Sequence, residues 1–188
     1  RWLEEFGGLL GLRVSDIPEI SEITADQLLP YEYPTDDEIE EVGVTGLFLG
    51  YFIPWDGFTN VLVSRANGFE TFPRAVETTF LTYENLDNYQ AGIHDYFKFL
   101  KFGFGRASDH ASLHIRRGRL IRPDAIEIVR NIDGRYPWSY LGRSLEEILR
   151  PLGITLPEFD DICDQFTNPS LFETSAAGDF GRRPDRTL

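Results

Sequence analysis

The sequence predicts an α/β fold in which one or a few buried strands are followed by a mainly helical region. Three observations support this prediction. The 188 residues, of which 41% are hydrophobic and 14% aromatic, are enough for one sizeable core. The run Leu47–Ile53 is apolar at every side chain, as in a strand buried on both faces of an α/β sheet. Beyond Arg74, helix-start patterns follow one another at short intervals.

The first third of the chain is expected to hold two short helices and the buried strand. The Gly-rich stretch Glu4–Ile20 reads as irregular. Two capping boxes predict helices over 26–29 and 36–41, namely Thr24 with Gln27 and Thr35 with Glu38. Pro54 ends the strand. Residues 59–67 fit a short helix stopped by Gly68, although Val61 and Val63 also suit a strand.

The helical region is expected to hold at least five helices. Asp87 or Asn88 can cap a helix that runs to about Phe102, and its core face would carry Ile93, Tyr96, Phe97 and Leu100. Ser108 or Asp109 can cap the next helix, which runs through about Arg117. The later starts are Pro123 and two capping boxes, Ser144 with Glu147 and Thr155 with Glu158.

Composition limits where the protein works and what it binds. The only cysteine is Cys163, which excludes a disulfide framework and a cysteine-based metal site. No apolar run is as long as a membrane span, and no signal peptide opens the chain, so we expect the cytoplasm. The chain begins at Arg1 and contains no Met, so we expect a piece of a longer protein.

The charge is strongly acidic, with 31 Asp and Glu against 18 Lys and Arg and a net charge of −13. Residues 98–122 reverse this balance, because Asp109 is their only acid. Their cations are Lys98, Lys101, Arg106, Arg116, Arg117, Arg119 and Arg122. A local basic island indicates an anionic ligand. A small phosphorylated ligand fits better than nucleic acid, which the remaining acidic surface would repel.

Two rows of side chains concentrate this chemistry. One row has helical spacing i, i+4, i+7 and comprises His94, Lys98 and Lys101; the next helix repeats the spacing with His110, His114 and Arg117. If the helices pack as a hairpin through Gly103 and Gly105, the rows could meet across a groove. Alternatively, the lysines form a solvated face and the histidines bond nearby backbone; both interpretations stay open.

Other candidate chemistries are weaker. His110 and His114 could hold Zn²⁺, but the arginines around them disfavour a cation, and no metal is predicted. A Ser–His–Asp triad lacks a nucleophile turn of the GxSxG kind. Asn85, Asp87, Asn88 and Gln90 could recognise sugar hydroxyls or an N-acetyl group, although they also fit helix capping. Trp55 could stack on a sugar or base face and Asp56 could accept from a hydroxyl or orient a nucleophile, although a turn with a packed Trp fits as well.

No catalytic residue is assigned. The predicted substrate-binding residues are Trp55, Asp56, Asn85, Asp87, Asn88, His94, Lys98, Lys101, Arg106, His110, His114 and Arg117.

Four stretches resemble the N-acetyl sugar amidotransferase family, the PP-loop ATPases of O-antigen and related surface-polysaccharide biosynthesis. They are VTGLFLGYFIPWDGFTNVL, YENLDNYQAGIHDYFKFLKFGFGRASDHASLHIRRGRL, IVRNIDGRYPWSYLGRSLEEIL and FDDICDQFTNPSLF. The resemblance runs from about Val14 to Phe172, is most specific around 94–117, and covers the carboxyl-terminal half of such a protein.

This resemblance implies the C-terminal part of a Rossmann-like PP-loop fold of the adenine nucleotide alpha hydrolase kind. Residues 1–72 would then end the α/β PP-loop-type domain. The helix-start patterns predict a helical region over 73–172, and the last residues, 173–188, have little to bury and are predicted to form a flexible tail. The implied reaction uses ATP, with Mg, to convert a sugar N-acetyl group into an acetamidino group. The implied partners are a nucleotide-linked N-acetyl sugar and glutaminase and cyclase-like subunits similar to imidazole glycerol phosphate synthase. The charge and the hydropathy of the sequence predict no nucleic acid and no membrane span.

One departure from the family pattern is large. The ATP-binding signature Ser-Gly-Gly-x-Asp-Ser is absent, and neither GGLLG nor GFGR replaces it. We expect the signature upstream of Arg1 and expect this chain alone to be inactive. Two alternatives remain: a non-catalytic docking module for the glutaminase and cyclase-like subunits, and a tRNA-modifying PP-loop enzyme, which the acidic surface disfavours.

Overall fold

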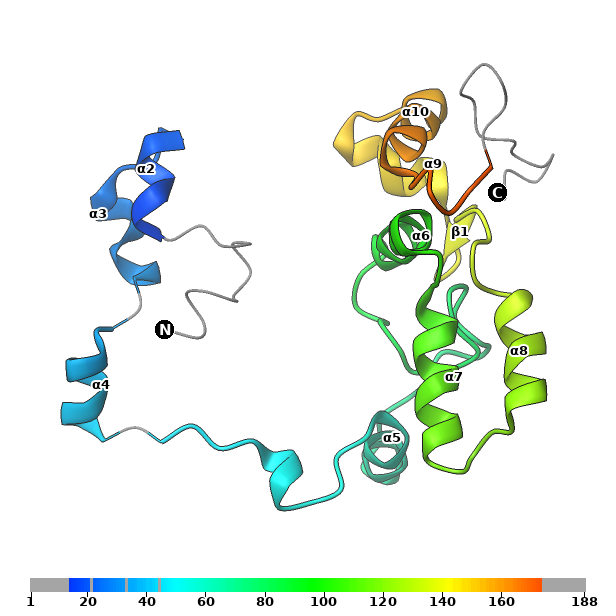
Figure 1. Ribbon diagram of the computed structural model, residues 1–188, viewed down its shortest axis with the longest axis horizontal. Coiled ribbons are helices and arrows are strands. Elements are labelled where there is room, and N and C mark those ends of the chain that lie inside the picture. The colour runs from blue at the N-terminus through cyan, green and yellow to red at the C-terminus, as the bar shows by residue number, and fades with distance from the viewer. Residues whose placement is uncertain (1–13, 21, 33, 44, 174–188) are drawn as a thin grey trace. The chain divides into compact units, whose positions relative to one another are not determined.

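The computed structural model describes residues 14–173 except 21, 33 and 44 (Figure 1). The chain divides into two compact units, Arg1–Trp55 and Asp56–Leu188. The predicted bounds 1–72, 73–172 and 173–188 stay predictions. Among the described residues the structure is mixed but mainly helical, with one small antiparallel sheet.

The first unit contains short helical segments. They are η1 (Val14–Asp16), α2 (Ile17–Ile20), α3 (Ala25–Leu28), η2 (Leu29–Tyr31), α4 (Asp36–Val42) and η3 (Leu49–Tyr51). Both predicted capping boxes are present at the starts of α3 and α4. The expectation of irregular structure is wrong for Val14–Ile20, which is helical, and the rest of Glu4–Ile20 lies outside the described residues.

The predicted buried strand Leu47–Ile53 is wrong. Its backbone closes a 3-10 turn, in which Tyr51 N donates to Phe48 O at 3.0 Å and Phe52 N donates to Leu49 O at 2.9 Å. Leu47 and Tyr51 are 71% and 87% exposed. A strand buried on both faces needs hydrogen-bonded neighbours at both edges, and no described residue pairs with this segment.

The second unit contains the longer helices. They are α5 (Gly57–Ala66), α6 (Ala91–Phe102), α7 (Arg106–Arg116), α8 (Arg122–Arg130), α9 (Leu145–Leu149), η4 (Arg150–Leu152) and α10 (Leu156–Phe166). Strands β1 (Ser139–Tyr140) and β2 (Arg143–Ser144) pair antiparallel. The predicted helices are confirmed, including the ambiguous segment 59–67, and the boxes at Ser144 and Thr155 begin α9 and α10.

The predicted caps of α6 and α7 are wrong. Helix α6 begins after Gln90, and Asn88 instead accepts a hydrogen bond from Gln90 N at 2.8 Å within the preceding turn. Helix α7 begins two residues before Ser108, with Gly105 at its N-cap. A distant carboxylate, that of Asp133, replaces the local cap by accepting from Gly105 N, Ala107 N and Ser108 N at 2.8, 3.1 and 3.2 Å.

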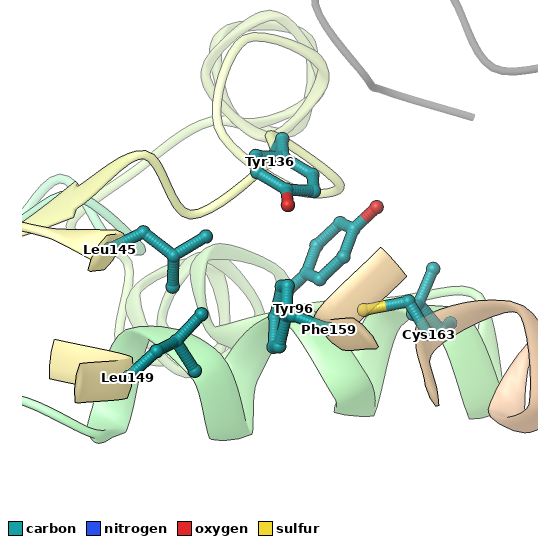
Figure 2. Close-up of a cluster of buried hydrophobic side chains, with 7 residues drawn as sticks. Tyr96, Tyr136, Leu145, Leu149, Phe159 and Cys163 are labelled. Atoms are coloured by element: carbon teal, nitrogen blue, oxygen red, sulfur yellow. The ribbon is translucent and has the colours of Figure 1, made fainter. Parts of the chain in front are cut away.

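The core of the second unit joins α6, α9 and α10 (Figure 2). Its buried members are Tyr96, Leu100, Tyr136, Leu145, Leu149, Phe159 and Cys163. The predicted core face of α6 is confirmed, because Ile93 and Phe97 pack against this cluster beside Tyr96 and Leu100. With this face of α6 buried, Asp95 of the same helix contacts Arg106 of α7 and Thr78 of the preceding loop.

Candidate functional site

One stripe of α7 carries Arg106, His110 and His114 at i, i+4 and i+8, and we call these three residues the α7 polar row. All three contact side chains of the loop 76–86 or of residues next to it. That loop is closed on itself by main-chain bonds from Val76 N to Leu81 O at 2.9 Å and from Thr79 N to Val76 O at 3.0 Å. The row therefore faces a fixed surface.

Arg106 is held by the buried carboxylate of Asp95 on α6. Its Nε and Nη2 donate to the two carboxylate oxygens at 2.6 and 2.7 Å, and Thr78 Oγ1 donates to Oδ2 at 2.7 Å. With its side-chain oxygen oriented toward Arg106, Asn85 accepts from the guanidinium at 3.0–3.1 Å. Burial raises the pKa of Asp95, but the bonds from Arg106, Thr78 and His94 outweigh burial and hold the pKa below its usual value.

His110 lies between a hydroxyl and a carboxylate. Its Nδ1 is 2.7 Å from Thr79 Oγ1, and its Nε2 is 3.7 Å from Glu84 Oε2. Burial lowers the pKa of His110 against the opposing effect of Glu84, so the imidazole is neutral at neutral pH. The alternative that this histidine bonds nearby backbone is wrong, because its partners are the side chains of the loop 76–86.

His114 is buried among aromatic rings. The ring of Phe58 is 6.1 Å away and that of Phe80 is 5.7 Å away, both edge-on. Burial lowers the pKa of His114, and the positive charge of Arg119 lowers it further. This environment favours a neutral imidazole, which can donate one hydrogen bond and accept another without carrying a charge.

Asp56 and Arg119 pair beside His114. Arg119 Nη1 donates to Asp56 Oδ1 at 3.0 Å, and the guanidinium lies 4.8 Å from the centre of the Phe58 ring. Burial raises the pKa of Asp56, but bonds from Arg119 and Thr59 outweigh it and bring the pKa to about 2. Asp56 also caps α5, so its charge serves the helix and the ion pair together.

The row on α6 points elsewhere. His94 is largely exposed and its Nδ1 is 3.0 Å from Asp95 Oδ1. Lys98 pairs with Asp109, and Lys101 lies 4.4 Å from the centre of the Phe166 ring on α10. The two rows therefore contact different elements, and the expectation that they meet across one groove is wrong. The turn at Gly103 and Gly105 joins α6 to α7, but the two helices do not pack side by side as a hairpin: Figure 1 shows α6 end-on and α7 along its length. The lysines contact Asp109 and α10.

The remaining predicted residues are exposed. Asp87 and Asn88 lie in the turn before α6, and Trp55 belongs to the first unit. Arg117 ends α7. Arg116 and Arg122 lie near it, on either side of the turn between α7 and α8. None of these three arginines forms an ion pair with a described residue. Whether any of the predicted residues binds substrate stays a prediction.

The Gly-rich turn Gly103–Arg106 does not fit a nucleotide phosphate. Asp133 accepts from the main-chain N–H of Gly105 and from the Ser108 hydroxyl, which lies 2.6 Å from it. A Cβ at position 105 would lie 2.5 Å from the Asp133 carboxylate, so the turn is already filled by a negative group. An anionic phosphate would be repelled there.

Sequence reasoning missed several partners of the α7 polar row and the partner of Asp56. These are Thr78, Thr79, Glu84, Asp95 and Arg119. The threonines and Glu84 lie in a loop without regular periodicity, so no spacing pattern marks them. Of these residues, only Arg119 could have been found from the sequence, because it belongs to the basic island of residues 98–122.

The described residues contain no group of three or more His, Cys, Asp or Glu side chains placed to hold a metal ion. Within the same part of the chain, no helix combines the length and apolar character needed to cross a membrane.

Comparison with known families identifies the chain. Residues 67–183 match the family described as LPS biosynthesis protein WbpG-like, C-terminal domain. The match covers more than half of the chain and includes α6 to α10 with the whole α7 polar row. No curated protein matches the chain. The family match confirms the predicted resemblance to the carboxyl-terminal part of a lipopolysaccharide-biosynthesis protein, and the chain belongs to the WbpG-like C-terminal domain family.

Proposed function

We propose that the chain is the carboxyl-terminal part of an ATP-dependent amidotransferase of lipopolysaccharide and O-antigen biosynthesis. Its substrate is a nucleotide-linked N-acetyl sugar. Ammonia from a glutaminase partner, working with a cyclase-like subunit, replaces the oxygen of the acetamido group and leaves an acetamidino group. Family membership supports the pathway, and the resemblance of the sequence to N-acetyl sugar amidotransferases supports the reaction.

This chain is assigned no part in holding ATP. The one described Gly-rich turn that could approach a phosphate is closed by Asp133, and GGLLG lies outside the described residues. The nucleotide-binding loop of the proposed Rossmann-like PP-loop fold is therefore sought in another part of the full-length protein. The role proposed for this chain is recognition of the sugar donor.

The observation that carries this role is the α7 polar row against the loop 76–86. Two neutral histidines and a carboxylate-held arginine converge there within one compact unit. Neutral imidazoles donate and accept hydrogen bonds, which suits sugar hydroxyls and an acetamido group. The exposed arginines Arg116, Arg117 and Arg122 lie around the turn from α7 to α8, where they can attract the diphosphate of the donor.

The test is product formation by the full-length protein with its glutaminase and cyclase-like subunits. Nucleotide-linked N-acetyl sugar, ATP and isotopically labelled glutamine are supplied, and the sugar is analysed by mass spectrometry. The proposal predicts labelled nitrogen in place of the acetamido oxygen, with formation that depends on ATP. Complete turnover of glutamine with an unaltered sugar overturns the reaction assignment.

A matched pair of variants tests the role of this chain in that assay. Changing Arg117 to Glu should raise the KM for the nucleotide sugar by about tenfold, because a charged contact to phosphate is lost and repulsion is added. Arg130→Glu on α8 changes the same charge at an exposed site and should leave KM near its original value. Equal effects of the two substitutions count against a specific phosphate contact.

A docking role is the second candidate, and one observation favours it. Phe48, Tyr51 and Phe52 of the first unit are exposed apolar side chains close together in sequence. Contiguous exposed apolar surface is common at protein interfaces. Capture of the glutaminase and cyclase-like subunits by this chain, with sugar turnover unaffected by the Arg117 variant, would favour docking over sugar recognition.

A further inference from the structure

A groove of ≈ 370 Å³ lies beside the α7 polar row, between α8 and the loop 76–86. Its lining residues are Phe80, Asp124, Glu127, Ile128, Asn131 and Ile132. Helices α7 and α8 lie side by side, and the loop packs against both (Figure 1). The volume falls in the range of about 300–1,000 Å³ that small-molecule sites occupy.

The polar side of the groove consists of hydrogen-bond acceptors. Asp124, Glu127 and Asn131 recur at i, i+3 and i+7 and so share one face of α8 or its carboxyl end. Neither carboxylate pairs with a cation among the described residues. Asn131 Nδ2 donates to the Glu127 main-chain oxygen at 2.9 Å, which leaves the amide oxygen as the group that can face a ligand.

The apolar side consists of Ile128, Ile132 and the ring of Phe80. Phe80 also lies edge-on to His110 and His114, at 6.4 and 5.7 Å between ring centres. One aromatic ring therefore lines the groove and contacts both histidines. A ligand in the groove would rest against a side chain that the α7 polar row holds in position.

We propose that this groove is a sugar subsite that binds a neutral pyranose ring. Ring hydroxyls donate to the carboxylates of Asp124 and Glu127 and to Asn131 Oδ1, while the C–H face of the ring covers Phe80. The two negative charges exclude phosphate, so the diphosphate of a nucleotide sugar must lie outside the groove. The inference deepens the proposed function and rests on it for the choice of a sugar over other polyhydroxylated ligands.

The test observes the groove directly in this 188-residue chain. The methyl groups of Ile128 and Ile132 are labelled for NMR and assigned with Ile→Val variants, and the chain is titrated with free N-acetylglucosamine. Both methyls should shift in a saturable way, whereas the methyl of Ile148 in the core should not. Uridine monophosphate, an anionic probe without a pyranose, should leave all three unchanged.

Substitutions in the groove then separate specific from general effects. Asp124→Asn and Glu127→Gln together should weaken the titration about tenfold or more, since two hydrogen bonds to charged groups are lost. Both side chains are exposed, so these variants should keep the fold. Asp161→Asn on α10 is the matched control and should titrate as the original chain does. Phe80→Leu should also weaken binding, with the Ile148 methyl reporting whether the core is intact.

Three results overturn the subsite: no shift of either groove methyl at tens of millimolar sugar, the same titration in the Asp124/Glu127 and Asp161 variants, or an equal response to uridine monophosphate. The outcome is independent of the reaction assay. If the Ile128 and Ile132 methyl signals shift with sugar but the full-length enzyme does not form the product, the sugar subsite is supported and the amidotransferase assignment is opposed. An active enzyme whose Asp124/Glu127 variant keeps its sugar KM opposes the groove alone.

Discussion

Asp95 on α6 receives both arms of the Arg106 guanidinium on α7, with Nε and Nη2 at 2.6 and 2.7 Å from its two oxygens. Because Asp95 is only 3% exposed, this pair joins the two helices through a buried charge. Thr78 and Asn85 add bonds from the loop 76–86. The pair therefore fixes both the α6–α7 crossing and the loop that faces the α7 polar row.

The first prediction concerns this pair. Asp95→Ala leaves the half-buried guanidinium without its counter-charge, and we expect a loss of about 3–5 kcal/mol in the free energy of unfolding. Lys98→Ala removes a pair whose acid, Asp109, is 49% exposed, and should cost at most about 1 kcal/mol. Chemical denaturation measures both. Similar losses in the two variants would contradict a special role for the buried pair.

The second prediction concerns pH. Burial lowers the folded-state pKa of His110 and His114 below the unfolded value of about 6.5. On acidification, these histidines are therefore protonated in the unfolded chain at a higher pH than in the folded chain. The stability that is present above the unfolded pKa is lost as the pH falls toward the folded-state pKa values. The free energy of unfolding should decline on acidification below about pH 6.5.

Denaturation curves at closely spaced pH values measure this decline. In the double variant His110→Asn/His114→Asn, the free energy of unfolding should depend less on pH between the unfolded-state and folded-state pKa values of the two histidines. This holds even if the double variant is less stable at every pH. Acidification still adds a later loss near the carboxylate range, because the folded pKa of Asp95 is also lowered. A slope that survives in the double variant is incompatible with this account.

The third prediction concerns the start of α7. Gly105→Ala would place a Cβ 2.5 Å from the Asp133 carboxylate, which must then give up its bonds to the first turn of the helix. Loss of such a cap costs about 0.5–2 kcal/mol. Gly46→Ala, where a Cβ meets nothing within 4 Å, should be nearly neutral. Thermal denaturation compares them, and an unchanged melting temperature for Gly105→Ala would refute the capping role of Asp133.

Local patterns predicted the helices well because their causes are local. The boxes at Thr35, Ser144 and Thr155 each place a side chain three residues from its partner, and each begins a helix. The start of α7 could not be found in this way, since its cap comes from Asp133, far along the chain. The run Leu47–Ile53 misled for the same reason: pairing partners decide a strand, and apolar side chains alone do not supply them.

The candidate site was predicted in part. Helical spacing placed His110 and His114 on one face, and the basic island pointed to Arg106 and Arg117. The acids beside Arg106 and His110 could not be read from spacing, because Asp95 and Glu84 reach them through tertiary packing. Asp56 pairs in the same way with Arg119 of the basic island. The pairing of cations with those acids is also why the island presents fewer free charges than its sequence indicates.

The most direct test of the account is the affinity of the full-length protein for its nucleotide-linked N-acetyl sugar, measured by titration calorimetry with His110→Asn. Asparagine can keep the bond to Thr79 Oγ1 but offers nothing at the position of Nε2, so the fold is preserved while the recognition group is lost. The account predicts a Kd raised about fivefold to tenfold, as for one lost hydrogen bond, and no change for His94→Asn on α6. An unchanged Kd in the correctly folded His110 variant would contradict the claim that the α7 polar row recognises the sugar donor.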